Sequence, residues 1–251
     1  MVSLYDLISC WFYGSLYALA LTGFTHRVYF SPGDGSRVLH VYIDGDGRPW
    51  LRRAVINLRP EVPQPLMLQA MALDERPALY LTRPCYHQQF DADKCEPWYW
   101  THGRYAPEIV ESMAAVVQRW VANHGHAKVR LFGHSGGGSI ALLMARDLPD
   151  IEAIVTVAAN LDTAAWTRYH GYTALLGSLN PIAAGLPSGI AQFHYLGSED
   201  RNVPPGIFPA IGANPNVAVR IVPGQGHRCC WLDDWPTILQ ETDTFMMQKN
   251  P

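Results

Sequence analysis

The sequence predicts a single α/β domain built on a mainly parallel sheet with helices on both faces. Its 251 residues suit one domain of this kind and are enough to bury a sizeable core. Apolar strand-like runs alternate with helix-like segments from Val38 onward, and this alternation is typical of parallel sheets covered on both faces. A glycine-rich motif at residues 133–138 lies between one such run and one such segment. We expect residues 23–251 to form this domain.

The hydrophobic pattern predicts the individual elements. Residues 107–123 carry apolar side chains every three to four positions, which indicates a helix with one buried face. Residues 26–30 and 38–43 resemble strands, and the turn residues between them predict a hairpin. Further strands are expected at residues 78–82, 129–132, 151–158, 192–196 and 217–222, and further helices at residues 65–73, 139–147 and 236–247. Residues 163–189 interrupt the alternation, and we expect them to form a small lid.

Charge and cysteine content argue against a nucleic-acid partner and against a metal site. The net charge is −3, 16% of the residues are charged, and no block of like charge occurs, so no nucleic-acid partner is expected. The five cysteines show neither a C-x-x-C pair nor metal-ligand spacing with histidine, so no metal site is expected.

The first 22 residues are apolar and contain one charged side chain, Asp6. Residues 18–20 read Ala-Leu-Ala, which fits an export cleavage site, and residues 7–10 resemble a lipoprotein box that ends at Cys10. The basic segment that usually opens an export signal is missing. The apolar run is shorter than the roughly 20 residues of a spanning helix. We favour a protein that is exported, periplasmic or lipid-anchored, with membrane association through its N-terminus. The alternative is a cytoplasmic protein with an N-terminal helix packed on the domain.

The most specific motif is Gly-His-Ser-Gly-Gly-Gly at residues 133–138. It matches G-x-S-x-G, follows a predicted strand and precedes a predicted helix, which is the context that a nucleophilic serine requires. The glycines allow a turn tight enough to expose the oxygen of Ser135 near a helix N-terminus. The spacing fits neither a phosphate loop nor a dinucleotide fingerprint. The alternative is a glycine-rich turn with a passive serine.

With this motif the chain resembles the α/β-hydrolase superfamily, in its esterase and lipase-like branch, over about residues 38–247. The resemblance implies a nucleophile, an acid and a histidine in that chain order. It assigns Ser135 as nucleophile, Asp200 as acid and His227 as base, because Asp200 and His227 each follow a predicted strand. Competing acids are Asp162, which would cap a helix, and Glu199; competing histidines are His124, His126, His170 and His194.

The resemblance also implies an oxyanion hole made by two backbone N–H groups, those of Asp46 and Gly136. Asp44 stands where such hydrolases usually carry a histidine. The carboxylate of Asp46 would oppose a nearby oxyanion unless it points away or pairs with a base such as Arg48. The alternative is that this segment is a simple Asp-Gly turn.

Aromatic and cysteine residues complete the expected site. We expect Trp98, Trp100, Trp166 and Tyr169 to line a substrate pocket, although aromatic residues often serve packing alone. Cys85 and Cys95 lie in one polar loop, where they form either a disulfide or two unrelated thiols. The Arg-Pro-Cys and Cys-Cys-Trp segments, which end at Cys85 and Trp231, are similar to exported proteobacterial hydrolases of unknown substrate, a likeness that favours export.

Together these features predict a serine hydrolase that cleaves a carboxylic ester through an acyl-enzyme, without cofactor or metal. Its expected partner is a small-molecule acyl substrate. The alternatives are an acyltransferase or thioesterase that uses the same residues, and a catalytically silent hydrolase fold that serves as a binding module.

Overall fold

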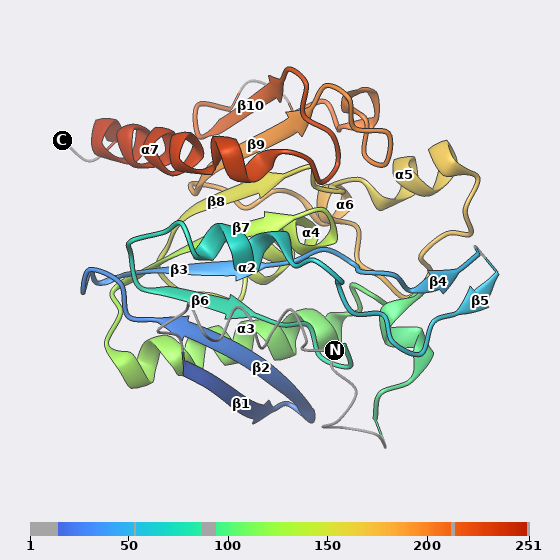
Figure 1. Ribbon diagram of the computed structural model, residues 1–251, viewed down its shortest axis with the longest axis horizontal. Helices are drawn as coiled ribbons and strands as arrows, with labels where there is room; N and C mark the ends of the chain where they lie inside the picture. The colour runs from blue at the N-terminus through green and yellow to red at the C-terminus, as the bar shows by residue number, and fades with distance from the viewer. Residues whose placement is uncertain (1–14, 53, 87–93, 212–213, 250–251) are drawn as a thin grey trace.

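The computed structural model describes residues 15–52, 54–86, 94–211 and 214–249. Within these residues, one eight-stranded sheet forms the centre of the molecule, in the order β1-β2-β6-β3-β7-β8-β9-β10 (Figure 1). From β6 to β10 all neighbouring strands are parallel, whereas β2 is antiparallel to both β1 and β6. The strands are β1 Ser15–Leu21, β2 Phe24–Ser31, β3 Val38–Ile43, β6 Ala78–Leu81, β7 Lys128–His134, β8 Ile151–Val157, β9 Ala191–Gly197 and β10 Val217–Val222. The predicted mainly parallel sheet is confirmed.

Helices cover both faces of this sheet. Helices α3 (Pro107–His124) and α4 (Gly136–Met144) share one hydrophobic core with the sheet. Helices α2 (Leu66–Met71) and α7 (Trp231–Lys249) share the core on the other face. The short elements are α5 Thr163–His170, α6 Pro181–Ala184, the 3-10 turns η1 Pro97–Trp100 and η2 Pro205–Ile207, and the small hairpin β4 Trp50–Leu51 and β5 Val55–Ile56.

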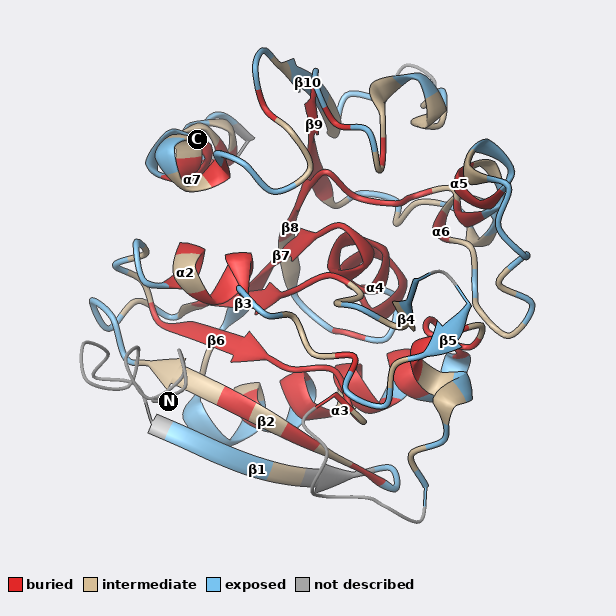
Figure 2. Ribbon diagram, turned by 45° about the vertical axis from the view of Figure 1, so that its right-hand side comes forward, coloured by how far each residue is buried: buried red, intermediate tan, exposed pale blue. Residues whose placement is uncertain are grey.

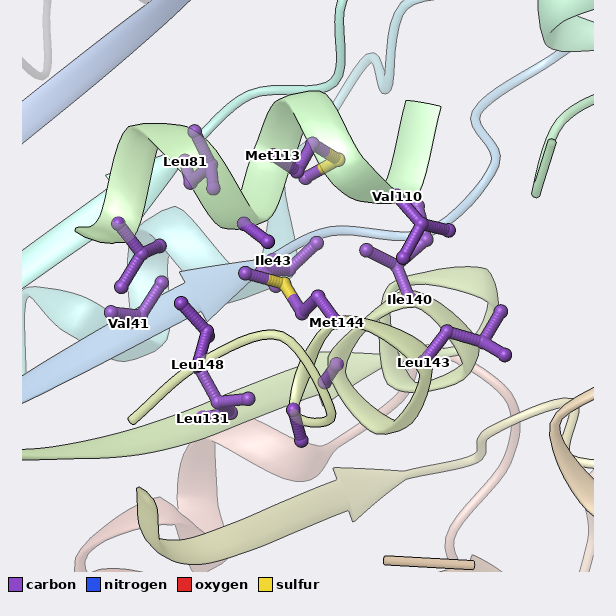
Figure 3. Close-up of a cluster of buried hydrophobic side chains, with 14 of the residues drawn as sticks. Val41, Ile43, Leu81, Val110, Met113, Leu131, Ile140, Leu143, Met144 and Leu148 are labelled. Carbon is purple, nitrogen blue, oxygen red and sulfur yellow. The ribbon is translucent and has the colours of Figure 1, made fainter. Parts of the chain in front are cut away.

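The central strands and α4 are buried, whereas β1 at one edge is largely exposed (Figure 2). On the α3 and α4 side, Val41 and Leu131 from the sheet meet Met113 of α3 and Met144 of α4 (Figure 3). The apolar stripe predicted for α3 is therefore the face that it buries. The helix ends at Gly125, whose φ of 71° is the left-handed conformation typical of a helix C-terminus.

The predicted hairpin between β2 and β3 is wrong. Strand β6 lies between them, antiparallel to β2 and parallel to β3. The hairpin is instead formed by β1 and β2, whose tight turn at Thr22 and Gly23 has positive φ at both residues. Turn chemistry at residues 31–36 thus indicates a change of direction but not the strand to which the chain returns.

Two further boundaries differ from the sequence prediction. Helix α7 begins at Trp231, ahead of Pro236, because Trp231 and Trp235 are fully buried in its first turns. Residues 15–21 form β1, so the alternative of an N-terminal helix is wrong for that stretch. Cys10 and the rest of residues 1–14 lie outside the described residues. Among the helices of the described part of the chain, none is both long and apolar enough to cross a membrane.

Candidate active site

Ser135 occupies the sharp turn between β7 and α4. Its φ of 53° and ψ of −124° are sterically strained for a residue with a side chain. The turn closes because the backbone of Gly137 and Gly138 fills the space that a Cβ of Gly133 would need. The Ser135 N–H donates to the carbonyl of Val157 at 3.0 Å, which ties the turn to β8. The serine oxygen is thereby held at the carboxyl edge of the parallel sheet.

Ser135, His227 and Asp200 form a continuous chain of hydrogen bonds. The Nε2 atom of His227 lies 3.1 Å from Oγ of Ser135, and its Nδ1 lies 2.8 Å from Oδ2 of Asp200. The other oxygen of Asp200 accepts the backbone N–H groups of Asn202 and Val203. Burial raises the pKa of the Asp200 carboxyl, but His227 and these amides outweigh it, so the pKa is lowered and Asp200 is ionised at neutral pH. An ionised Asp200 holds the proton of His227 on Nδ1 and leaves Nε2 free to accept from the serine.

The competing acids lie elsewhere. Oδ1 of Asp162 accepts the N–H groups of Ala164 and Ala165 at 3.1 and 3.0 Å, and Asp162 is the N-cap of α5, as expected from the sequence. Glu199 is exposed.

The competing histidines are bonded away from Ser135. His194 is buried in β9 against Thr156, and His124 donates to Trp120 within α3. His170 donates to the carbonyl of Asn202 at 2.7 Å. His126 is held at the far end of the sheet, beside His124.

Two residues that the sequence analysis did not assign hold His227 in place. Nε2–H of His134 donates to the carbonyl of His227 at 2.7 Å, and burial with the nearby His227 lowers the pKa of His134 to about 3, so this ring is neutral. Nδ2 of Asn202 lies 3.0 Å from Nε2 of His227, whose single lone pair is taken by the hydroxyl of Ser135. The Asn202 carbonyl accepts from Trp166 and His170, which connects α5 to the histidine. His134 is the variable residue of G-x-S-x-G, but Asn202 carries no sequence signal beyond its closeness to Asp200.

The two expected oxyanion donors lie beside the serine. A Cβ on Gly45 would be 3.0 Å from the Cβ of Ser135, so the backbone leading into Asp46 passes directly over the nucleophile. Gly136 is the first residue of α4, where an N–H has no partner within the helix. Among the described residues, neither amide donates a hydrogen bond.

The Asp46 carboxylate is neutralised, but not by Arg48, which is a correction to the expected partner. Its oxygens accept from Nη1 of Arg83 at 2.5 Å, Nη1 of Arg104 at 3.0 Å and the hydroxyl of Tyr105 at 2.7 Å. Burial raises the pKa of this carboxyl, but the two arginines outweigh it and the pKa is lowered. A Cβ on Gly136 would collide with this carboxylate, so the cluster packs directly against the nucleophile turn.

Asp44 is in a different setting although it is only two residues away. Its carboxylate accepts the N–H of Met67, at 3.2 Å, where α2 begins. Among the described residues it forms no ion pair within 4.0 Å. Burial raises its pKa to about 6, against the lowering effect of the Met67 N–H. Asp44 therefore supports α2 and does not replace a histidine in binding the oxyanion.

A cavity of about 650 Å³ opens over Ser135 and His227. Of the aromatic residues expected to line it, Trp166 does so, and Trp50 and Tyr172 join it. The structure does not bring the other three to the cavity: Trp100, the last residue of η1, is buried, Trp98 packs over Gly103 and Gly177, and Tyr169 is exposed to solvent. Residues 166–175 form part of the wall, and whether they open as a lid stays a prediction.

Four cysteines are paired in the structure. Cys85 and Cys95 form a disulfide with their Cα atoms 5.2 Å apart, and the adjacent Cys229 and Cys230 are bonded to each other. Over the described residues, no three His, Cys, Asp or Glu side chains gather as metal ligands would.

Comparison with known proteins supports the architecture. The model of the family "Lipase (class 3)" matches residues 84–158, a stretch that includes the nucleophile turn. No curated protein matches the chain.

Several solved structures share the fold at low identity. An α/β serine hydrolase without lid from Xanthomonas campestris has a TM-score of 0.61 and 13% identity, covering 91% of this chain and 93% of its own. Est1E from Butyrivibrio proteoclasticus has a TM-score of 0.58 and 13% identity, covering 93% and 98%. An α/β serine hydrolase homologue from Coxiella burnetii has a TM-score of 0.53 and 17% identity, covering 94% and 97%. The chain has the α/β-hydrolase fold, and together with the lipase match this supports serine hydrolase activity in general.

Proposed function

We propose that this α/β-hydrolase-fold chain cleaves carboxylic esters through a covalent acyl-enzyme on Ser135. The observation that carries the proposal is the unbroken sequence of hydrogen bonds from Asp200 through His227 to Ser135. The strained turn that holds the serine gives further support, because such strain is typical of functional sites.

In this mechanism Nε2 of His227 takes the hydroxyl proton as Ser135 attacks the acyl carbonyl. Asp200 keeps the imidazole in the required tautomer and stabilises it when it becomes charged. The N–H groups of Asp46 and Gly136 stabilise the oxyanion of the tetrahedral intermediate. His227 then returns the proton to the leaving alcohol, and water releases the acyl group by the same steps in reverse.

The direct test is Ser135→Ala. We expect loss of labelling by a fluorophosphonate probe and a fall in kcat for 4-nitrophenyl esters by about 10⁶, the scale seen when such a unit loses its nucleophile. Ser36→Ala is the matched control, because Ser36 lies before β3, at the far end of the sheet from Ser135. Near-normal ester turnover in Ser135→Ala would contradict the proposal.

A further inference from the structure

The cluster around Asp46 contains more positive than negative charge. Arg83 and Arg104 both pair with Asp46, and their side chains are 3% and 5% exposed. The two tyrosines of the cluster are neutral, since burial raises the pKa of Tyr86 to about 12 and that of Tyr105 above its usual value. Among the described residues, two guanidinium groups therefore face one carboxylate, and one positive charge has no counter-charge there. A buried charge is costly unless an opposite charge or hydrogen bonds satisfy it.

Arg104 brings this charge to the substrate cavity. Its Nε donates to the carbonyl of Thr101 and its Nη1 to Asp46. Among the described residues Nη2 has no hydrogen-bond partner, and Arg104 lines the cavity together with Trp166, whose ring lies 5.9 Å from its Cζ. By contrast, Nη2 of Arg83 is used by the carbonyl of Arg104. Nε of Arg83 also has no partner among the described residues, but Arg83 does not line this cavity, so Nη2 of Arg104 is the free nitrogen on a residue that does.

The rest of the cavity wall carries the same sign of charge. Arg48 and Arg228 also line it, and neither forms an ion pair with a described carboxylate. Asp46 is the one carboxylate among the described residues that line it. A cavity lined by one sign of charge concentrates ligands of the opposite sign.

We propose that the substrate is an ester that carries its own carboxylate, which binds Nη2 of Arg104 and is drawn in by Arg48 and Arg228. This inference rests on the proposed ester hydrolysis and adds the substrate class to it. Arginine suits the role, because a guanidinium donates directional hydrogen bonds to a carboxylate and stays charged when buried. The competing explanation is that the spare charge stabilises the oxyanion, in which case neutral and anionic esters would benefit alike.

The test compares esters that differ only in this charge. On the acyl side the pair is the 4-nitrophenyl monoester of adipic acid and 4-nitrophenyl hexanoate; on the alcohol side it is 4-acetoxybenzoate and its methyl ester. In at least one pair we expect kcat/KM for the anionic member to be about tenfold higher or more at low salt, and the preference to fall as ionic strength rises. The pair that shows the preference identifies the side of the ester that carries the charge.

Substitutions of the cavity arginines show which residues cause the preference for the anionic ester. Arg104→Gln should abolish it, whereas Arg104→Lys keeps the charge and should retain part of it. Arg48→Gln and Arg228→Gln, at exposed positions, should each reduce the preference for the anionic ester. They provide the test if Arg104→Gln does not fold. Arg168→Gln is the matched control, because Arg168 is exposed on α5 and does not line the cavity.

Direct binding separates this inference from the proposed function. Titration calorimetry should detect adipate binding to Ser135→Ala but not to a variant that also carries Arg104→Gln. Equal kcat/KM within both ester pairs, or an equal loss for both members in Arg104→Gln, would overturn the inference and leave ester hydrolysis intact. If no ester is cleaved but adipate binds through Arg104, the anion site stands and the proposed hydrolysis fails.

Discussion

Two loops at the carboxyl edge of the sheet carry aspartates whose pKa values shift in opposite directions. The loop after β9 supplies Asp200, which faces one imidazole and two backbone amides. The loop after β3 supplies Asp44 and Asp46. Asp44 accepts the Met67 N–H where α2 begins and has no ion pair with a described residue, whereas Asp46 pairs with two arginines. The pKa of Asp44 rises to about 6, whereas the pKa values of Asp46 and Asp200 fall. Asp44, Asp46 and Asp200 are thus the same residue type at the same edge of the sheet, and the groups that contact each carboxylate determine its charge state and its role.

Asp200→Asn should have the largest effect, because the Asp200 loop alone is proposed to take part in proton transfer. An amide does not hold His227 in the required tautomer, so we expect kcat to fall by about 10⁴. Steady-state kinetics with a 4-nitrophenyl ester measures this. Glu199→Gln, one residue earlier and exposed, is the control and should change kcat by less than about tenfold. A mild effect of Asp200→Asn would remove the functional difference between the two loops.

Asp46→Asn should chiefly destabilise the fold. It leaves Arg83 and Arg104 without their counter-charge, and breaking such a buried pair costs about 3–5 kcal/mol of unfolding free energy. Because the folded pKa of Asp46 is lowered, its stabilisation is present above the unfolded value near 4 and disappears as the pH falls through the folded value. Urea unfolding should therefore give the variant a much lower unfolding free energy than the unsubstituted protein at pH 7. At pH 3 the difference in unfolding free energy between the two proteins should be smaller. A pH-independent difference would contradict the assignment.

Asp44→Asn should have the opposite effect on stability and raise the unfolding free energy at alkaline pH. A carboxyl whose pKa is raised to about 6 on folding stabilises the protein fully below about pH 4 and loses this contribution as the pH rises through 6. Asparagine keeps an acceptor for Met67 without a charge. We expect the variant to be about 1–3 kcal/mol more stable than the unsubstituted protein at pH 8, a gain that vanishes at pH 4. Thermal melts across this range check it, and destabilisation at pH 8 would show that Asp44 is a needed anion.

Asp162→Asn should have the smallest effect. Asp162 also follows a strand at this edge, where it caps α5 and accepts from Nδ2 of Asn180. Asparagine caps almost equally well and keeps an oxygen acceptor. We expect kcat to change by less than about tenfold and the unfolding free energy by less than about 1 kcal/mol. A loss of kcat comparable to that of Asp200→Asn would mean that Asp162 shares the acid role.

The sequence predicted the parts of the site that follow from local chemistry. Gly133 and its neighbours specify the nucleophile turn, and the strand ends before Asp200 and His227 follow from apolar runs. The parallel sheet and the stripe of α3 have the same local origin. These features require only short stretches of chain.

Features that depend on distant segments were not predicted. Arg83 and Arg104 lie 37 and 58 residues after Asp46 in the sequence. Nothing in the sequence around Asp46 indicates that these two arginines, and not the nearby Arg48, pair with it. The role of Asn202 could not be predicted because it depends on the contact between the loop after β9 and α5, which forms only in the folded chain. The insertion of β6 between β2 and β3 is likewise a choice of pairing partner that turn residues do not encode. The lining of the cavity was wrongly predicted for the same reason: Trp98 and Trp100 belong to one aromatic run, but Trp100 is buried, and Trp98 is partly exposed and packs over Gly103 and Gly177.

Strand β1 has a consequence for how the chain could be processed. It pairs with β2 along seven residues, and the ring of Tyr17 lies 5.1 Å from that of Trp120 on α3. A cut at residues 18–20 would remove most of β1 and turn β2 into a bare sheet edge, open to pairing with other chains. A lipoprotein cut before Cys10 would keep β1 whole, with only residues 11–14 between a lipid on Cys10 and the sheet. The five steps from Cys10 to Ser15 span at most about 18 Å, so that route would bring this edge of the molecule close to a bilayer surface.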